Sequence, residues 1–494
     1  MRNFTLSEIA QHNKKDDLWI IIHGKIYDLT TFLPEHPGGQ KVILKCAGKD
    51  ATSAFDSHHP PDMIERFLSP DVCIGQPVME KSHEDNANIK RQQTETDEEE
   101  RIQLARKNMP SIDELYNAYD FESVAKTILS DDAWGYISSG TDDEITMREN
   151  HSAYHRIWFR PRVMVDVSKI DMTTHMLGQK ASLPFYITAA AFCKTAHPNG
   201  EMALTRAAGR KDIIQMIPTY ASCSFKDIVR ARISSNQIQW YQLYVTRDRK
   251  ATQRIVEEAE AKGMKGLFVT VDTPELGRHL KEMRINNQRD DPSEMETGEG
   301  TVSVSSFFDP SLNWSDIAWL KSITKMPILL KGVTRLEDAV LSAQHGLQGV
   351  VLSNHGGRQM DFAPSTIEIL PEVMGALQRE GLDKNFEVYI DGGIRRGSDI
   401  FKAIALGAKG VGIGRPFLYA MACYGERGVE RLIDLFQAEL TMCMRLMGAP
   451  TIADIKPDMV DIRNLKDHFV ANPTDYLAKY AYERMQPRGK LSKL

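Results

Sequence analysis

The stretch GVVLSNHGGR, residues 349–358, decides the fold of the larger part of the chain. A short apolar run stops abruptly at polar residues and two glycines, as expected where a buried strand ends at a functional edge. Seven further runs of this kind lie between residues 184 and 416, separated by helical patterns such as RKATQRIVEEAEAKG at 249–263. Nearly continuous apolar strands that alternate with helices indicate a buried parallel sheet.

Eight strand and helix units are the number that closes a (β/α)8 barrel. A doubly wound open α/β sheet would show the same alternation and is the competing architecture. We therefore expect an α/β (β/α)8 TIM barrel within residues 109–494. The long polar gap at residues 275–312 is typical of a functional lid or a disordered loop. The strand runs are residues 184–190, 213–218, 238–245, 266–272, 327–333, 349–355, 387–393 and 410–416.

Composition limits the classes of function. The 494 residues allow two or three domains, and 42% hydrophobic residues suffice for large cores. The net charge of −6 disfavours non-specific nucleic-acid binding, and no apolar run is long enough to span a membrane. The six cysteines are dispersed and show no CxxC spacing, which predicts free thiols in a reducing compartment. The start of the chain resembles no signal or transit peptide, so we expect the cytosol, or the mitochondrial intermembrane space if a presequence is missing.

Two histidine motifs mark the first 77 residues. LPEHPGGQKVI at 33–43 contains His36, and FDSHHPPDMI at 55–64 contains His58 and His59. Imidazole ligates haem iron, and two axial histidines leave no open site, which suits electron transfer. WIIIHGKIYDL at 19–29 predicts two short strands around a turn, so His23 is interpreted as a turn residue.

Residues 4–75, with these motifs in this order, resemble the cytochrome b5 family. The resemblance implies an α+β domain over residues 1–77 that binds haem b, with His36 and His59 as axial ligands and His58 as the neighbouring candidate. Residues 78–108 have few large apolar residues and an acidic run at 97–100, which predicts a polar linker or a frayed helix.

Polar side chains gather where the predicted barrel strands end, which is where such barrels carry their chemistry. His355 is the natural general base because its pKa is ordinarily near neutrality, and Asp272 can hold its ring. Arg358 offers two parallel donors to a carboxylate. Tyr244 can hydrogen-bond a substrate hydroxyl, and Lys331 supplies a fixed positive charge.

The motifs SNHGGRQMD, VTVDTPELG, LLKGV, IDGGIRRG and GIGRPFLY resemble the FMN-dependent 2-hydroxy-acid dehydrogenase and oxidase family. The resemblance covers about residues 112–485 and implies FMN, a small L-2-hydroxy acid such as L-lactate as substrate, cytochrome c or a similar one-electron acceptor as partner, and a homotetramer. It implies His355 as base with Asp272 as its partner, Tyr244 at the hydroxyl, Arg358 and Tyr136 at the carboxylate, and Lys331 beside the flavin. The implied FMN-binding set is Ala189, Ala191, Gln242, Thr270, Lys331, Ser353, Asp391, Gly393, Arg395, Gly414 and Arg415.

Three positions depart from the family pattern. Pro218 stands where the family has Ser or Thr, and His279 stands where it has a second Arg. Tyr220 stands where its lactate dehydrogenases have Leu and its glycolate oxidases have an aromatic residue. These departures bear on the substrate more than on the reaction. An oxidase that uses oxygen and a non-catalytic haem or flavin sensor are the competing functions, and the intact set around His355 argues against the sensor.

Overall fold

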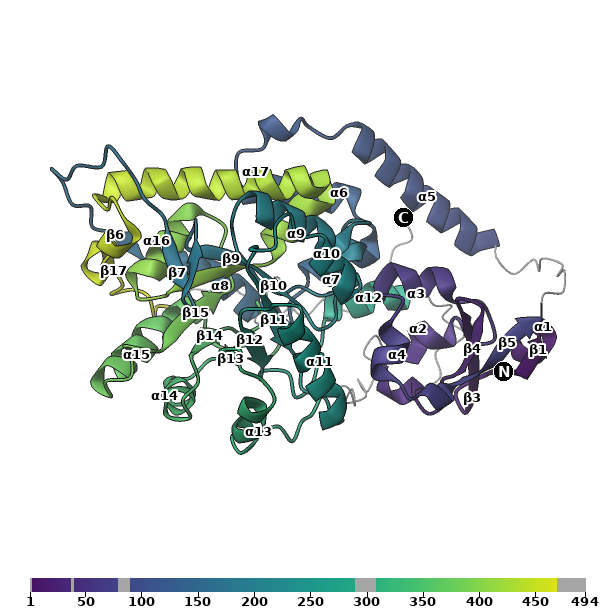
Figure 1. The fold of residues 1–494 in the computed structure, drawn as a ribbon. Coiled ribbons are helices and arrows are strands. Elements are labelled where there is room, and N and C mark those ends of the chain that lie inside the picture. The colour runs from purple at the N-terminus through teal and green to yellow at the C-terminus, as the bar shows by residue number, and fades with distance from the viewer. Residues whose placement is uncertain (1, 37–39, 79–88, 289–307, 469–494) are drawn as a thin grey trace, which may run out of the picture.

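The computed structural model describes residues 2–36, 40–78, 89–288 and 308–468. An N-terminal module lies beside a larger barrel, and helix α5 (Ile89–Lys107) runs along the outside between them (Figure 1). Within the described residues, no helix combines the length and apolar character that a membrane crossing needs.

The N-terminal module is a five-stranded sheet with short helices on both faces, as the predicted α+β fold allows: Leu44, Phe55 and Ile64 pack on one face, and Ile9 packs on the other. The predicted hairpin forms from β3 (Asp17–Ile22) and β4 (Lys25–Asp28), and its turn has positive φ at His23 and Gly24. Leu18, Ile20 and Ile22 alternate along β3 and pack in one cluster. The sheet order is β1 (Arg2–Thr5), β5 (Cys73–Val78), β4, β3, β2 (Asn13–Lys14), and the helices are α1 (Leu6–Ile9), α2 (Gln40–Leu44), α3 (Thr52–His58) and α4 (Met63–Phe67).

Helix α5 occupies the second half of the segment predicted as a linker or frayed helix. It is polar, but it is tied to the chain that follows: Arg101 donates to the carbonyl oxygens of Thr127 (3.0 Å) and Leu129 (3.3 Å) and pairs with Asp131 (3.2 Å). Three helices then precede the barrel, namely α6 (Ala118–Ile128), α7 (Asp131–Ser138) and α8 (Ile145–His155).

The eight predicted strands form a closed parallel barrel, which excludes the open doubly wound sheet. Closure is made by pairing of the last strand with the first, Val411 opposite Phe185 and Ile413 opposite Ile187. The strands are β9 (Phe185–Ile187), β10 (Gln215–Ile217), β11 (Gln239–Leu243), β12 (Leu267–Thr270), β13 (Ile328–Val333), β14 (Gly349–Leu352), β15 (Glu387–Asp391) and β16 (Gly410–Ile413).

Helices surround the barrel, and large side chains fill its interior. Tyr186, Trp240, Phe268 and Tyr389 belong to one buried cluster with residues of the hairpin β7 (Thr174–Met176) and β8 (Gln179–Ala181). That hairpin packs against the interior cluster. The polar groups gather at the carboxyl ends of the strands, where barrels of this kind carry their chemistry. The helices are α9 (Gly200–Arg210), α10 (Phe225–Arg230), α11 (Arg249–Ala261), α12 (Leu280–Gln288), α13 (Asp316–Ser322), α14 (Leu336–Gln344), α15 (Thr366–Arg379), α16 (Gly397–Ala405) and α17 (Arg415–Met447).

Candidate active site and cofactor cavity

One continuous cavity joins the N-terminal module to the carboxyl end of the barrel. Its volume is about 1820 Å³, and its lining includes His36 and His59 at one end and His355 and Arg415 at the other. Pockets for one small ligand usually measure roughly 300–1,000 Å³. The cavity is therefore large enough for two sizeable groups, one from each module.

The two predicted haem ligands face each other in the N-terminal module. The ring centroids of His36 and His59 are 6.0 Å apart with planes at 83°, which leaves room for a single metal atom bound from both sides. Phe55 packs 5.0 Å from His59, and apolar side chains including Ile43, Ile64 and Leu68 line the rest of this end. A flat apolar macrocycle with a bis-histidine iron fits this chemistry.

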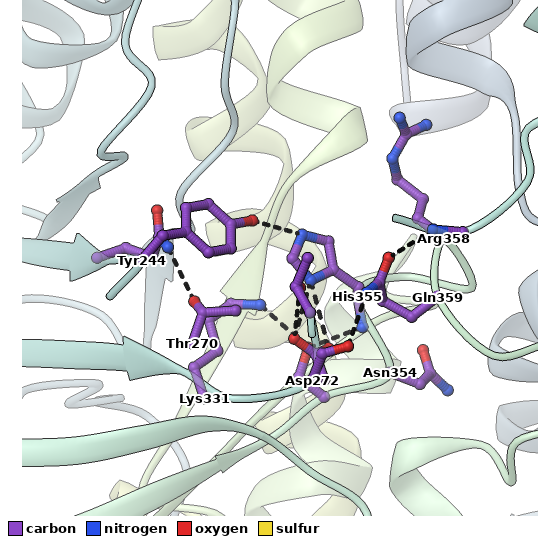
Figure 2. A network of polar contacts seen from close by, with 12 residues as sticks. Tyr244, Thr270, Asp272, Lys331, Asn354, His355, Arg358 and Gln359 are labelled. Atoms are coloured by element: carbon purple, nitrogen blue, oxygen red, sulfur yellow. Dashed lines mark hydrogen bonds and ion pairs between the residues drawn. The ribbon is translucent and has the colours of Figure 1, made fainter. Parts of the chain in front are cut away.

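The catalytic pair predicted in the barrel is assembled as expected. His355 Nδ1 lies 3.2 Å and 3.3 Å from the two oxygens of Asp272, and its Nε2 lies 3.3 Å from the Tyr244 hydroxyl (Figure 2). Burial raises the pKa of Asp272, but its electrostatic and hydrogen-bond interactions with His355 and the charge of Lys331 outweigh it and hold that pKa below its usual value. The ionised carboxylate favours the tautomer with the proton on Nδ1, so Nε2 is free to accept a proton from a substrate.

The backbone is arranged to bring this pair together. His355 has φ of +59°, a left-handed conformation that costs energy in a residue other than glycine and that gathers at functional sites. Gly332 makes room for the carboxylate, because a Cβ there would lie 2.5 Å from Asp272 Cβ. Gln359 fixes the chain on the other side by donating to the Asp272 carbonyl at 2.6 Å (Figure 2).

Buried polar groups beside the pair fit the polar parts of a flavin nucleotide. Lys331 is 4% exposed and lies 3.3 Å from Asp391 and 3.1 Å from the Ser353 hydroxyl. Among the described residues, Asp391 Oδ1 and the Thr188 hydroxyl are buried without a hydrogen-bond partner, and both residues line the cavity. Such atoms are costly unless a bound group satisfies them, and the hydroxyls of a ribityl chain are suited to do so.

The side-chain amide of Gln242, a predicted FMN-binding residue, is fixed by its neighbours. Gln242 donates to Thr270 at 2.8 Å and accepts from the backbone of Thr219 at 3.2 Å. Thr219 follows Pro218, but its hydroxyl donates to the Gln242 carbonyl at 2.7 Å. The hydroxyl lost at Pro218 is therefore not replaced by its neighbour.

Arg358 lies beside Tyr136. Its guanidinium binds backbone carbonyl oxygens of the segment that precedes the barrel. Nη1 donates to the carbonyl oxygens of Tyr136 (2.7 Å) and Ser139 (3.0 Å), and the group stacks 4.9 Å from the Tyr136 ring. Figure 2 shows the guanidinium turned away from His355. Nη2 lies 3.4 Å from His279 Nδ1, which places that departure from the family pattern in direct contact with Arg358. Carboxylate binding by Arg358 stays a prediction.

The predicted FMN-binding residues that follow the last two strands line the cavity, but the two arginines among them have protein partners. Arg415 donates to the carbonyl oxygens of Ile137, Gly356 and Ser139 at 2.7–2.9 Å, and burial lowers its pKa to about 10. Arg395 lies 2.9 Å from Glu122. Gly414 precedes α17, whose first turn supplies the backbone donors that favour a phosphate. Ala189, Ala191 and Gly393 also line this end, and FMN binding by these residues stays a prediction.

Sequence reasoning assigned no site role to several residues that line the cavity. The Phe308 ring lies 4.9 Å from Tyr244 and 6.0 Å from Tyr220, so three aromatic rings wall the space beside the catalytic pair. Asn150 comes from α8 and exchanges hydrogen bonds with Asn354 at 2.7–2.8 Å. Phe192 and Thr188 follow β9, where only alanines had been selected.

The fold and the two ends of the cavity define a flavin-type barrel enzyme fused to a haem-binding module. Two family models match the chain: a cytochrome b5-like haem and steroid binding domain over residues 5–78, and an FMN-dependent dehydrogenase over residues 125–462. The chain belongs to the FMN-dependent dehydrogenase family and carries a cytochrome b5-like domain ahead of it.

Two curated relatives resemble nearly the whole chain, and others resemble a smaller share of it. It is 50% identical over 483 residues to an L-lactate dehydrogenase (cytochrome) of Wickerhamomyces anomalus and 47% identical over 493 residues to that of Saccharomyces cerevisiae, and each match covers 97% of this chain and 83% of the relative. A flavocytochrome b2 variant with pyruvate bound superposes with a TM-score of 0.73 and 46% identity over 81% of this chain and 98% of that one. A peroxisomal (S)-2-hydroxyacid oxidase of Arabidopsis thaliana is 41% identical over 72% of this chain and 98% of its own length.

Proposed function

We propose that this chain oxidises a small L-2-hydroxy acid, with L-lactate to pyruvate as the expected reaction, and passes electrons through haem b to cytochrome c or a similar acceptor. The observation that carries the proposal is the single cavity with the His355–Asp272 pair at one end and the His36–His59 pair at the other. The relatives that match both domains are cytochrome-linked lactate dehydrogenases.

Each side chain of the site has a definable task. His355 Nε2 takes up a substrate proton, and ionised Asp272 orients the ring and stabilises the charge that forms. The Tyr244 hydroxyl marks where the substrate hydroxyl is bound, and Lys331 holds a positive charge in a dry setting. When bound beside Lys331 and Asp391, FMN would supply the acceptor for the substrate's two electrons, and haem b between His36 and His59 would supply the one-electron carrier.

The oxidase reading is less well supported. The hydroxyacid oxidase matches 72% of this chain, so more than a quarter of this chain has no counterpart in that protein.

The test uses the full chain with both cofactors, a panel of 2-hydroxy acids, and flavin bleaching without oxygen. Cytochrome c reduction should then exceed peroxide formation in air. Rapid peroxide formation that cytochrome c does not suppress would favour the oxidase, and a flavin that no hydroxy acid bleaches would favour the sensor.

Tyr220 should limit the length of the substrate. Its side chain is 6% exposed and stacks 5.4 Å from Tyr244 in the aromatic wall. Tyr220→Ala should raise activity on longer or aromatic 2-hydroxy acids relative to lactate, because the space it vacates lies beside the reacting hydroxyl. The ratio of kcat/KM values for mandelate and lactate measures this. Tyr116→Ala, at an exposed tyrosine, is the matched control, and an unchanged ratio in Tyr220→Ala would remove Tyr220 from the substrate pocket.

Assembly into a homotetramer is part of the proposal. Val163 and Met164, which is fully exposed, lie on a loop tied to the end of α17 by a hydrogen bond from Arg162 to Gly448 (2.7 Å). Leu446 near that end is 69% exposed, and we propose that these apolar side chains belong to the subunit interface. Met164→Glu should lower the mass found by sedimentation, whereas an unchanged mass would exclude this patch from the interface.

We propose the cytosol as the location of the protein, with the mitochondrial intermembrane space as the alternative.

A further inference from the structure

Phe192 lies where the two modules meet. It follows β9 and precedes the 3-10 turn η4 (Cys193–Thr195), and its ring contacts one aromatic side chain in each module. The ring centroid of His59 is 6.0 Å away with planes at 60°, and that of Tyr136 is 5.9 Å away with planes at 70°. Both are edge-to-face contacts within the range of favourable aromatic pairs.

The backbone of Phe192 adopts a conformation that costs conformational energy. Its φ of +56° and ψ of +40° are left-handed, a conformation that a bulky residue rarely adopts. Hydrogen bonds fix it from both sides: its N–H donates to the Tyr220 carbonyl at 3.3 Å, and its own carbonyl accepts from the Thr195 hydroxyl at 2.7 Å. Strained backbone conformations of this kind gather at functional sites. The strain therefore indicates a function for the Phe192 side chain.

The two partners of Phe192 belong to the two ends of the cavity. His59 faces His36 across the haem-binding end, and Tyr136 lies against Arg358 at the active-site end. Phe192 lines the same cavity, so the path from His59 to the active site runs along its ring. We propose that Phe192 is a positioning residue that docks the haem module on the barrel and thereby sets the rate of the flavin-to-haem electron step. This inference rests on the proposed function.

The test compares Phe192→Ala with the wild-type holoenzyme in two measurements. In stopped flow without oxygen, flavin reduction by lactate should stay within about twofold, because the ring does not contact the reacting atoms. Haem reduction should slow roughly tenfold, since two aromatic contacts that favour the docked state are lost. Hydrogen exchange should rise in peptides over residues 52–59, which lie in the other module and carry the contact to Phe192.

Phe192→Gly guards against a folding defect, because glycine adopts positive φ without strain and also lacks the ring. It should reproduce both effects, and Tyr116→Ala should show neither. Haem reduction at the wild-type rate in both variants, or unchanged exchange over residues 52–59, would overturn the inference. Loss of flavin reduction would also overturn it by placing Phe192 in the substrate site. If the wild-type haem accepted no electrons, the proposed function would fail, while the exchange experiment would still decide whether Phe192 docks the module.

Discussion

Replacement of His355 by Gln should lower the rate of flavin reduction by a factor of roughly 10² to 10⁴, the usual contribution of a general base. Glutamine fills a similar volume but accepts no proton at neutral pH. The carboxylate of Asp272, 3.2 Å from His355 Nδ1, would then hold a neutral amide in place of the ring that it orients. FMN binding should persist, since the polar groups around Lys331, Asp391 and Thr188 are untouched. Anaerobic stopped flow with lactate measures the rate, and flavin absorbance measures the occupancy.

The matched control is His345→Gln, which changes the same residue type at the end of α14, where the ring stacks 5.3 Å from Trp314 outside the cavity. This variant should reduce its flavin at the wild-type rate. Near-normal turnover in His355→Gln would remove His355 from the role of base. Loss of bound FMN in that variant would instead show that the residue holds the cofactor.

The catalytic residues at the strand ends could be predicted from the sequence, because all strands of a parallel barrel end at the same face. Asp272 and His355 are 83 positions apart, yet each directly follows an apolar run, and the carboxyl ends of all strands meet at one face. The same reasoning selected Lys331, and the implied FMN-binding residues Asp391 and Gln242 line the same cavity. The histidines of the N-terminal module were identified by their motifs rather than by periodicity.

Side-chain directions and strained backbones were beyond the sequence. Arg358 and Arg415 were placed at the correct strand ends, but their long side chains reach carbonyl oxygens of Tyr136, Ile137 and Ser139, in a segment ahead of the barrel whose position no periodicity reveals. Phe192 has positive φ without being glycine, so no residue type signals its turn. The polar composition of α5 left a helix and a linker equally open, and tertiary anchoring through Arg101 decides between them.

Loss of His36, the predicted haem ligand, should separate substrate oxidation from cytochrome c reduction. In full-length His36→Ala, the pair that faces across 6.0 Å is broken, and a haem with one axial histidine loses its closed coordination. The His355 site lies in the other module and keeps all of its partners, so reduction of a small dye by lactate should stay within about twofold. Cytochrome c reduction should fall to near background, because single electrons no longer leave through haem.

A second variant tests the same exit route by removing the haem pocket altogether. A chain that starts near residue 108 keeps the three helices ahead of the barrel and all residues of the active site, but it lacks the N-terminal module and α5. It should bleach its flavin with lactate, reduce the dye and leave cytochrome c oxidised. Cytochrome c reduction by this shortened chain at the rate of the full chain would show that electrons leave from the flavin directly. Rapid oxygen consumption with peroxide in the full chain as well would make oxygen the acceptor. Cytochrome c that stays oxidised in both experiments would show that electrons leave through the N-terminal module. That module carries His36 and His59 and none of the groups around His355.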